Sequence, residues 1–371
     1  IPVIFLDDYP FFDHYYTFND NIENYSLIYK DYLKKNIEEI SEPVKNYYFN
    51  FKNKPKKPDY IVSHLKSLKN SYKMLTYIKV NIKELSKACI RALLELFKNK
   101  KKIIIYTGLH KINRKNNTIN LSRLEKFLYE KILEYKNFFT KKYYQKISEN
   151  SIPKENFIFF APSFQPEYYS NIRTGIYEDY NLVLKIISSN LPDNWIIVYK
   201  EHPHQFLEKT GATLKDKNYY NEIKKIKNIK ILSEKIDTYD LIKNSKATVS
   251  VGGTIGMEAM ILGKPSILFG DAWYKSCKSI ITIENNQDMK NAFNKIMSGF
   301  KPDEIDILSF LEKIYSLSSR LMSLYLSRNF ENELINKSIE KTSNIKKEYH
   351  KVAEKFYEKF EALYRRDDKL K

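Results

Sequence analysis

The sequence predicts an α/β protein whose clearest part, residues 151–300, is a Rossmann-like domain with a parallel sheet covered by helices. Two observations carry this prediction. From residue 156 onward, short apolar runs typical of buried strands alternate with stretches that have helical spacing. In addition, Ser250–Gly270 holds five of the nine glycines in the 371-residue chain. Glycine is favoured where the backbone turns sharply or approaches another group closely, so this cluster indicates either a binding turn or several unrelated tight corners.

Strands and helices are expected to alternate along this domain. Six strands are predicted at 157–161, 195–199, 229–232, 247–251, 266–270 and 279–283. Four helices are predicted near 178–190, 237–245, 255–262 and 287–298. The fourth strand, the glycine turn at 252–254 and the helix at 255–262 form half of a nucleotide-binding unit, in which the turn amides and the helix N-terminus face outward as an anion site. Gly263 ends that helix and Pro265 blocks its continuation.

The flanking regions have a different character. Residues 1–150 are predicted to form a helix-rich N-terminal domain. Within it we expect strands at 1–6 and 101–109, an exposed basic loop at 51–60 and amphipathic helices over 61–99. Residues 301–371 are predicted to be helical to the end. Apolar residues recur every three or four positions in 346–371, and this face is expected to pack on the protein itself, with contact of its basic flank to an anionic membrane as the alternative.

Composition limits the classes of function. The chain has 43% hydrophobic residues, which is enough for packed cores, and a formal net charge of +18, which suits anionic partners such as phosphorylated substrates, nucleic acid or an acidic membrane face. Its two cysteines, Cys89 and Cys277, indicate no disulfide framework and suit a reducing cytoplasm. No apolar run reaches the roughly 18 residues of a membrane span. We therefore expect a cytoplasmic globular protein.

Chemically active side chains follow three of the predicted strands. Ligands of open α/β sheets bind beyond the carboxyl ends of the strands, so these positions are the first candidates for a site. They are Glu167 after the first strand, Lys200, Glu201, His202 and His204 after the second, and Ser250, Gly252, Gly253, Thr254 and Glu258 after the fourth. The ring of Pro203 disfavours helical backbone at His202, which gives the imidazole a defined direction.

Thr254 and Glu258 are four residues apart and are expected to share one face of a helix. A capping box starting at Thr254 would need Glu or Gln at the position of Met257, so Glu258 is not a capping partner. A phosphate held at Thr254 and a ribose hydroxyl bonded to Glu258 fit this spacing. Metal binding at His202 and His204 is the weaker interpretation, because no Cys, Asp or Glu has a recognisable ligand spacing with them.

Two strings of this domain, from "FIFFAPSFQPEYY" through "WIIVYKEHPHQ" (157–205) and "SKATVSVGGTIGMEAMILGKPSILFGDAWY" (245–274), resemble bacterial capsule and surface polysaccharide glycosyltransferases of the GT-B fold. The resemblance implies two Rossmann-like domains, with 1–150 on the acceptor side and the helices of 301–371 bracing both. It implies a CMP-activated donor carrying a 3-deoxy-ulosonic acid such as Kdo, or a sialic-acid-like sugar. The turn departs from the family pattern, since Gly-Gly-Thr replaces a more usual Ser-Thr or Ser-Ser pair.

The same resemblance implies roles for individual residues. His202 would bind the donor phosphate, and Glu258 would hold the ribose. Glu167 would act as the base toward an acceptor hydroxyl in an inverting reaction, or as the nucleophile in a retaining one. The expected catalytic residues are thus Glu167 and His202, and the expected donor-binding residues are Lys200, Arg173, His202, Ser250, Gly252, Gly253, Thr254 and Glu258. Among these, Arg173 is the candidate for a donor carboxylate.

A CMP-sugar loses a nucleoside monophosphate, so cationic side chains and amides can stabilise the leaving group, and neither a metal ion nor another cofactor is expected. The expected partners are a nucleotide-sugar donor, a polysaccharide or glycolipid acceptor and the inner face of the bacterial inner membrane, but not nucleic acid. UDP-sugar transfer and glycerophosphate transfer from CDP-glycerol are the alternatives among enzymes. A non-enzymatic basic protein that binds nucleic acid or membrane is the alternative of another class, and it leaves the three strand ends unexplained.

Overall fold

The computed structural model describes most of the predicted Rossmann-like domain and parts of its flanks. The described residues are 5–9, 15–19, 32–56, 103–106, 118–121, 123–166, 174–206, 214–317, 319–320, 350, 354 and 357. The helices predicted at 61–99 and nearly all of the stretch 346–371 lie outside these residues. So do two of the predicted site residues, Glu167 and Arg173.

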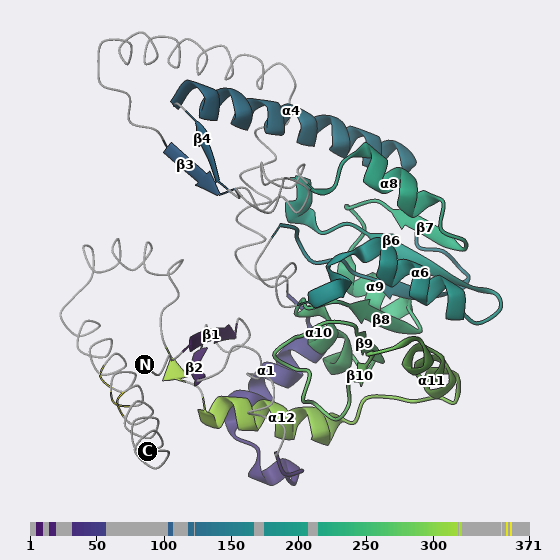
Figure 1. Cartoon of the computed structure of the whole chain (residues 1–371). Helices are drawn as coiled ribbons and strands as arrows, with labels where there is room; N and C mark the ends of the chain where they lie inside the picture. Colours follow the sequence, from purple (N-terminus) through teal and green to yellow (C-terminus); the bar gives the residue numbers. More distant parts are fainter. Residues whose placement is uncertain are drawn as a thin grey trace, which may run out of the picture.

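A six-stranded parallel sheet forms the centre of the structure (Figure 1). Its strands are β5 (Asn156–Phe160), β6 (Trp195–Lys200), β7 (Ile229–Leu232), β8 (Ala247–Ser250), β9 (Ser266–Leu268) and β10 (Ile281–Thr282). They lie in the order β10-β9-β8-β5-β6-β7, with every neighbouring pair parallel. The chain therefore builds the sheet outward from β5 in one direction and then, from β8, in the other. The strand order reverses between β5 and β8, which is where open α/β sheets bind their ligands.

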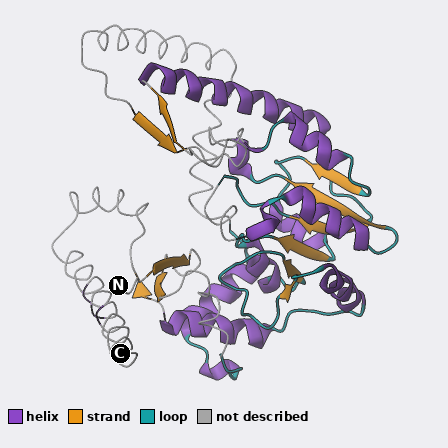
Figure 2. Cartoon of the chain, in the orientation of Figure 1, coloured by secondary structure: helices purple, strands orange, loops and turns teal. Residues whose placement is uncertain are grey.

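Helices cover both faces of this sheet (Figure 2). They are α6 (Tyr180–Asn190), α8 (Lys217–Lys224), α9 (Thr238–Asn244), α10 (Ile255–Ile261) and α11 (Asn286–Met297), with short 3-10 turns η3 (Gly175–Glu178) and η4 (Pro203–Phe206). Four of them begin at a side chain that accepts hydrogen bonds from backbone amides of the first turn. These N-caps are Asp179, Asp216, Asp237 and Asn285.

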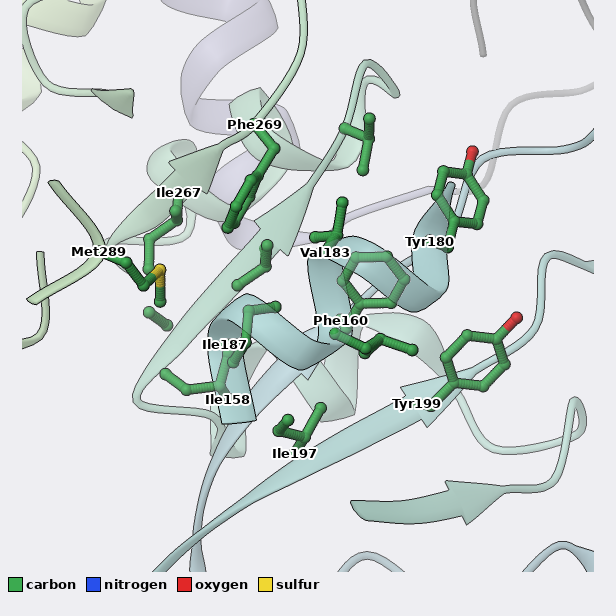
Figure 3. Close-up of a cluster of buried hydrophobic side chains, with 14 of the residues drawn as sticks. Ile158, Phe160, Tyr180, Val183, Ile187, Ile197, Tyr199, Ile267, Phe269 and Met289 are labelled. Carbon is green, nitrogen blue, oxygen red and sulfur yellow. The ribbon is translucent and has the colours of Figure 1, made fainter. Parts of the chain in front are cut away.

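Alternation along the strands divides the core between the two faces of the sheet. On one face, Phe160 of β5 packs against Tyr180 of α6 and Tyr199 of β6, with ring centroids 5.7 and 5.9 Å apart (Figure 3). On the other, Phe159 and its neighbours pack under α9 and α10. The next residue after Tyr199, Lys200, therefore faces the α9 side.

The secondary structure confirms the predicted parallel α/β domain. All six strands and all four helices occur within about two residues of the predicted positions, although β9 and β10 are shorter than expected. The helix α8 was not predicted, because its sequence "KNYYNEIK" carries only two buried residues, Tyr220 and Ile223. The two-domain arrangement and the domain boundaries stay predictions.

The N-terminal half contains more strand than predicted. A three-stranded antiparallel sheet is formed by β1 (Phe5–Tyr9), β2 (Tyr15–Asn19) and β11 (Ser319–Arg320), and β3 (Ile103–Tyr106) pairs with β4 (Thr118–Leu121). Of these, β1 and β3 overlap the predicted strands, and β2 and β4 were missed. The prediction that residues after 301 are helical throughout is wrong at β11. A pairing partner more than 300 positions away along the chain decides that conformation, and local spacing cannot reveal it.

Two helices outside the sheet lie side by side, α1 (Glu42–Asn53) and α12 (Glu304–Leu317), and α12 also contacts α10 (Figure 1). Glu312 accepts hydrogen bonds from the amide (2.9 Å) and hydroxyl (2.7 Å) of Ser41, and Tyr48 donates to Glu304 at 3.2 Å. The predicted basic loop at 51–60 is wrong at its start, since α1 continues through Asn53 and buries Val44 and Tyr48. The 3-10 turn η2 (Ile37–Glu39) precedes α1.

A long helix, α4 (Arg123–Ile147), runs beside α8 and the η4 turn (Figure 1). Its Tyr144 is fully buried and packs on Phe206 and Tyr220, with ring centroids 5.1 and 5.0 Å away. Among the described residues, no helix is both long enough and apolar enough to cross a membrane.

Candidate functional site

Two loops meet at the point where the strand order reverses. The loop after β5 carries Ser163, and the turn after β8 carries Gly253. A Cβ atom added to Gly253 would lie 3.0 Å from Oγ of Ser163, so the Ser163 side chain packs closely against the Gly253 backbone. The Ser163 hydroxyl is buried and has no hydrogen-bond partner among the described residues. A buried polar atom without a partner favours a site that a ligand completes.

Tyr274 holds the turn after β8 in place. Its hydroxyl donates to the carbonyl of Gly253 at 2.6 Å, and since a phenol has one proton, it accepts from the Ser250 hydroxyl 3.0 Å away. The ring also occupies the space in which a side chain at residue 256 would lie, because a Cβ there would be 2.3 Å from the Tyr274 hydroxyl. Ser250 thus faces Tyr274, and Gly256 admits the tyrosine ring.

Thr254 and Glu258 lie on one face of α10, as the sequence predicts. Thr254 is the N-cap of this helix, and its hydroxyl donates to Oε1 of Glu258 at 2.9 Å. Burial raises the pKa of Glu258 to about 7, although hydrogen bonds from Thr254 and Tyr239 oppose the shift. Burial, followed by the nearby charge of Glu258, raises the pKa of the phenol of a second tyrosine, Tyr47 of α1. Helix α10 has only seven residues, so an anion here would rely more on the turn amides than on the helix dipole.

The loop after β6 presents His202 at the same edge of the sheet. The ring nitrogen Nδ1 accepts from the amide of His204 at 3.2 Å. The proton of the neutral imidazole therefore lies on Nε2, which is available as a donor. Burial, followed by the charges of His204, Lys215 and Lys200, lowers the pKa of His202 to about 3. His202 is thus neutral at physiological pH, and it offers a hydrogen bond rather than a charge.

Polar contacts join this loop to the one after β5. Gln205 accepts from the amide of Gln165 at 3.0 Å and donates to its carbonyl at 2.7 Å. The rings of Phe164 and His202 lie 6.5 Å apart. Lys200, at the end of β6, donates instead to the hydroxyl of Thr238 at the start of α9. The three loops therefore form one continuous edge at the carboxyl ends of β6, β5 and β8.

Beneath His202 lies a charged pair, of which the sequence analysis named Glu201 as a candidate and missed Lys215. Lys215 and Glu201 form an ion pair of 3.1 Å with no exposed side-chain surface. Burial lowers the pKa of Lys215, and the charge of Glu201 opposes that shift. No local pattern in "ATLKDKNYY" marks Lys215, because the segment that carries it is brought to Glu201 only by the packing of α8.

The structure brings together most of the predicted site residues. His202 lies on one side of β5, and the Ser250–Thr254 turn and Glu258 lie on the other. The positions of Glu167 and Arg173 are not described. Among the described part of the chain, no three His, Cys, Asp or Glu side chains are grouped as metal ligands. The sequence analysis missed Ser163, Tyr239 and Tyr274. For Ser163 the only sequence signal was the apolar run before it, and for Tyr274 it was the aromatic string "DAWY" that contains it.

This fold and edge define a Rossmann-like α/β protein with its candidate site at the switch point of the sheet. The chain belongs to the family described as capsule polysaccharide biosynthesis protein, whose model matches residues 47–280. The match runs from α1 to the residue before β10 and so includes all three loops. Family membership supports the predicted class of enzyme, a glycosyltransferase.

Solved structures similar to the chain include glycosyltransferases and epimerases. KpsC of Thermosulfurimonas dismutans, a beta Kdo 2,7 transferase, is 17% identical over 52% of this chain and 57% of its own, with a TM-score of 0.31. UDP-GlcNAc 2-epimerase of Methanocaldococcus jannaschii is 19% identical over 49% of this chain and 50% of its own, also with a TM-score of 0.31. The chain thus spans about half the length of these structures. No curated protein sequence is similar enough to count as a match.

Proposed function

We propose that this chain is a glycosyltransferase of capsule polysaccharide synthesis that moves a 3-deoxy-ulosonic acid such as Kdo, or a sialic-acid-like sugar, from a CMP-activated donor. The observation that carries the proposal is that the loop after β5, next to the switch point, contacts both the His202 loop and the turn after β8. In addition, the sequences of these loops resemble transferases that use CMP-activated sugars. Family membership supports the capsule pathway, and the donor and acceptor are our inference.

The donor phosphate would lie between His202 and the turn at 252–254. A neutral imidazole with its proton on Nε2 can donate to a phosphate oxygen, and the turn amides can donate from the other side. Ser163, whose buried hydroxyl has no partner in the described residues, lies beside Gly253 of this turn and would be a further donor. Such fixed donors stabilise negative charge that grows on a leaving group without having to reorient during the reaction.

The ribose would lie against Glu258. One of its carboxyl oxygens accepts from Thr254, and the other is suited to a ribose hydroxyl. Tyr47 and Tyr239, both close to this carboxyl group, offer apolar surface next to the sugar. In this proposal the nucleoside would lie on the α10 side of the sheet and the transferred sugar would lie toward the His202 loop.

The reaction breaks the bond between the anomeric carbon and the phosphate oxygen, so CMP leaves with both bonding electrons. The acceptor hydroxyl forms the new bond and gives its proton to a base, for which Glu167 is the proposed residue. Since CMP carries a single phosphate group, His202 and the turn amides would suffice for the leaving charge, and we propose that no metal ion takes part. The net charge of +18 suits a peripheral position on an anionic membrane that carries the acceptor.

Thermal unfolding in the presence of CMP, UDP or CDP-glycerol tests which nucleotide the donor carries. A ligand that binds only the folded chain raises the melting temperature according to its affinity, so CMP is expected to give the largest rise at equal concentration. A larger rise with UDP or CDP-glycerol would replace the CMP donor by one of these. Salt-sensitive binding of nucleic acid that persists in His202→Ala, together with no response to any nucleotide, would favour the non-enzymatic alternative.

A further inference from the structure

The buried ion pair of Lys215 and Glu201 has no part in the function proposed so far. Nζ of Lys215 lies 3.1 Å from one carboxylate oxygen of Glu201 and 3.3 Å from the other, and neither side chain reaches solvent. A buried ion pair seldom stabilises a fold more than apolar side chains of the same size would. Stability alone therefore does not explain why two charges lie under the candidate site.

The surroundings of the pair leave it little freedom. Oε2 of Glu201 accepts from the hydroxyls of Tyr199 at 2.6 Å and Tyr220 at 2.8 Å. The Lys215 ammonium lies over the ring of Tyr180, 4.8 Å from its centroid. Because β6, α6 and α8 each contribute to these contacts, the carboxylate is fixed relative to the sheet and to both helices.

The fixed carboxylate is bonded directly to the backbone of His202. Oε1 of Glu201 accepts from the His202 amide at 2.7 Å. The amide of Glu201 donates in turn to the hydroxyl of Tyr144 at 2.9 Å, and that hydroxyl donates to the carbonyl of Leu232. The backbone amides of two consecutive residues are therefore held, that of Glu201 by the Tyr144 hydroxyl and that of His202 by the Glu201 carboxylate.

We propose that Lys215 and Glu201 are positioning residues, which hold the backbone at His202 so that its Nε2–H group faces the phosphate of the bound nucleotide. This inference rests on the proposed function, in which His202 binds that phosphate. Lys215 neutralises the carboxylate, so Glu201 can hold the His202 amide without drawing a proton onto the imidazole. The titratable or charged groups around His202 are His204, Lys200, Lys215 and Glu201, and the first three lower its pKa together with burial.

Two double variants separate positioning from structural support. Glu201→Gln/Lys215→Met removes both charges but keeps an oxygen that can accept from the His202 amide, and its NH₂ group can donate to the tyrosine hydroxyls. Glu201→Leu/Lys215→Met removes the charges and the acceptor, in the manner of apolar replacements of buried ion pairs. Nitrogen NMR of the histidines gives the tautomer of His202, with its signals assigned by comparison with His202→Gln. Calorimetry gives the affinity for CMP, and circular dichroism reports folding.

We expect the Gln variant to keep the Nε2–H tautomer and to bind CMP within about twofold of the original chain. The Leu variant is expected to show a mixture of tautomers and about tenfold weaker binding of CMP. A folded Leu variant with the original tautomer and affinity would overturn the proposal. Tyr144→Phe provides the same comparison where the Leu variant does not fold, because it releases the Glu201 amide and the Leu232 carbonyl but leaves the ion pair in place. An unchanged tautomer in this variant would also count against positioning.

The single variant His202→Ala distinguishes the failure of this inference from the failure of the proposed function. If His202→Ala binds CMP as well as the original chain, His202 does not bind the phosphate and the proposed function is wrong at that contact. If His202→Ala weakens binding but the Leu variant does not, the phosphate contact stands and the positioning role alone is excluded.

Discussion

Glu201 and Glu258 lie on opposite sides of the central strand β5, and their environments differ in one respect. Glu201 is paired with the Lys215 ammonium and accepts from two tyrosine hydroxyls. The partners of Glu258 in the described part of the chain, Thr254 and Tyr239, are uncharged, and burial raises its pKa to about 7. Glu201 has its full set of partners without a ligand, whereas Glu258 has no charged partner among the described residues. On this difference we base the proposal that Glu201 maintains the site and that Glu258 contacts the ligand.

The largest expected effect comes from Lys215→Met, which removes the charged partner of Glu201. An unpaired buried carboxylate costs about 3–5 kcal/mol of unfolding free energy, and urea unfolding measures it. Restoring neutrality with Glu201→Gln should recover most of the loss. The exposed Lys224→Met serves as the matched control and should leave the urea midpoint unchanged. Equal midpoints for Lys215→Met and Lys224→Met would show that the pair is dispensable.

His202→Ala should have the next largest effect. Loss of one donor to a leaving phosphate, worth ~2–4 kcal/mol of transition-state stabilisation, lowers turnover ~30- to 1000-fold. The melting temperature should change little, because the half-buried ring contributes no charge to the fold. His350→Ala, at an exposed histidine, is the control. Near-original turnover in folded His202→Ala would remove His202 from the mechanism.

Glu258→Gln tests the proposed contact of Glu258 with the ribose. It should lower the affinity for CMP more than the turnover, since a ribose contact is the same in the ground and transition states. We expect CMP to bind about tenfold more weakly, which corresponds to about 1.4 kcal/mol. Glu167→Gln should do the reverse and lower turnover with little change in affinity. If both variants lose only affinity, this division of roles is wrong.

The raised pKa of Glu258 also predicts a pH dependence of stability. Between about pH 4.5, its ordinary pKa, and about pH 7, the folded carboxyl group keeps a proton that the unfolded chain has lost. The unfolded state then binds fewer protons, so this group lowers the unfolding free energy as the pH rises through that window. Glu258→Gln should therefore gain stability relative to the original chain at pH 8 compared with pH 4. A constant difference between the two proteins over this range would show that Glu258 ionises normally.

The smallest expected effect concerns the contact between the loops after β5 and β8. Gly253→Ala places a methyl group 3.0 Å from Oγ of Ser163, which costs about 1 kcal/mol of stability when the neighbour has to move. Adding Ser163→Ala removes that oxygen and should restore the melting temperature. Ser163→Ala by itself should not destabilise the chain, because its hydroxyl has no partner in the described residues, but it should weaken CMP binding if that hydroxyl touches phosphate.

Most of the parallel domain could be predicted from sequence because its strands are buried on both faces. Runs such as "FIFF" and "WIIVY" are continuous and apolar for that reason, and the polar residues that follow them mark the binding edge of the sheet. The strand β11 could not be predicted in this way, because Ser319 and Arg320 have no strand pattern of their own and become extended by pairing with β2.

The glycine cluster at 250–270 shows which features a local sequence pattern can predict and which it cannot. Its composition predicted either a binding turn or unrelated tight corners. The structure explains Gly256 by the approach of Tyr274 and Gly253 by the approach of Ser163. Tyr274 and Ser163 both lie outside the glycine turn. Packing against them requires glycine at 256 and at 253, the same positions that shape the candidate site.

The sequence alone determined the order of the six parallel strands and of four of their helices, the segments after the strands that carry His202 and Glu258, and the resemblance to capsule glycosyltransferases. These features depend on spacing and residue type within short segments. Only the tertiary structure decided that Lys215 neutralises Glu201 beneath His202, that Tyr274 holds the Gly253 carbonyl and that Glu258 has no cation beside it in the described chain. The charge state of a buried group depends on its neighbours in space, and these neighbours come from positions that only folding brings together.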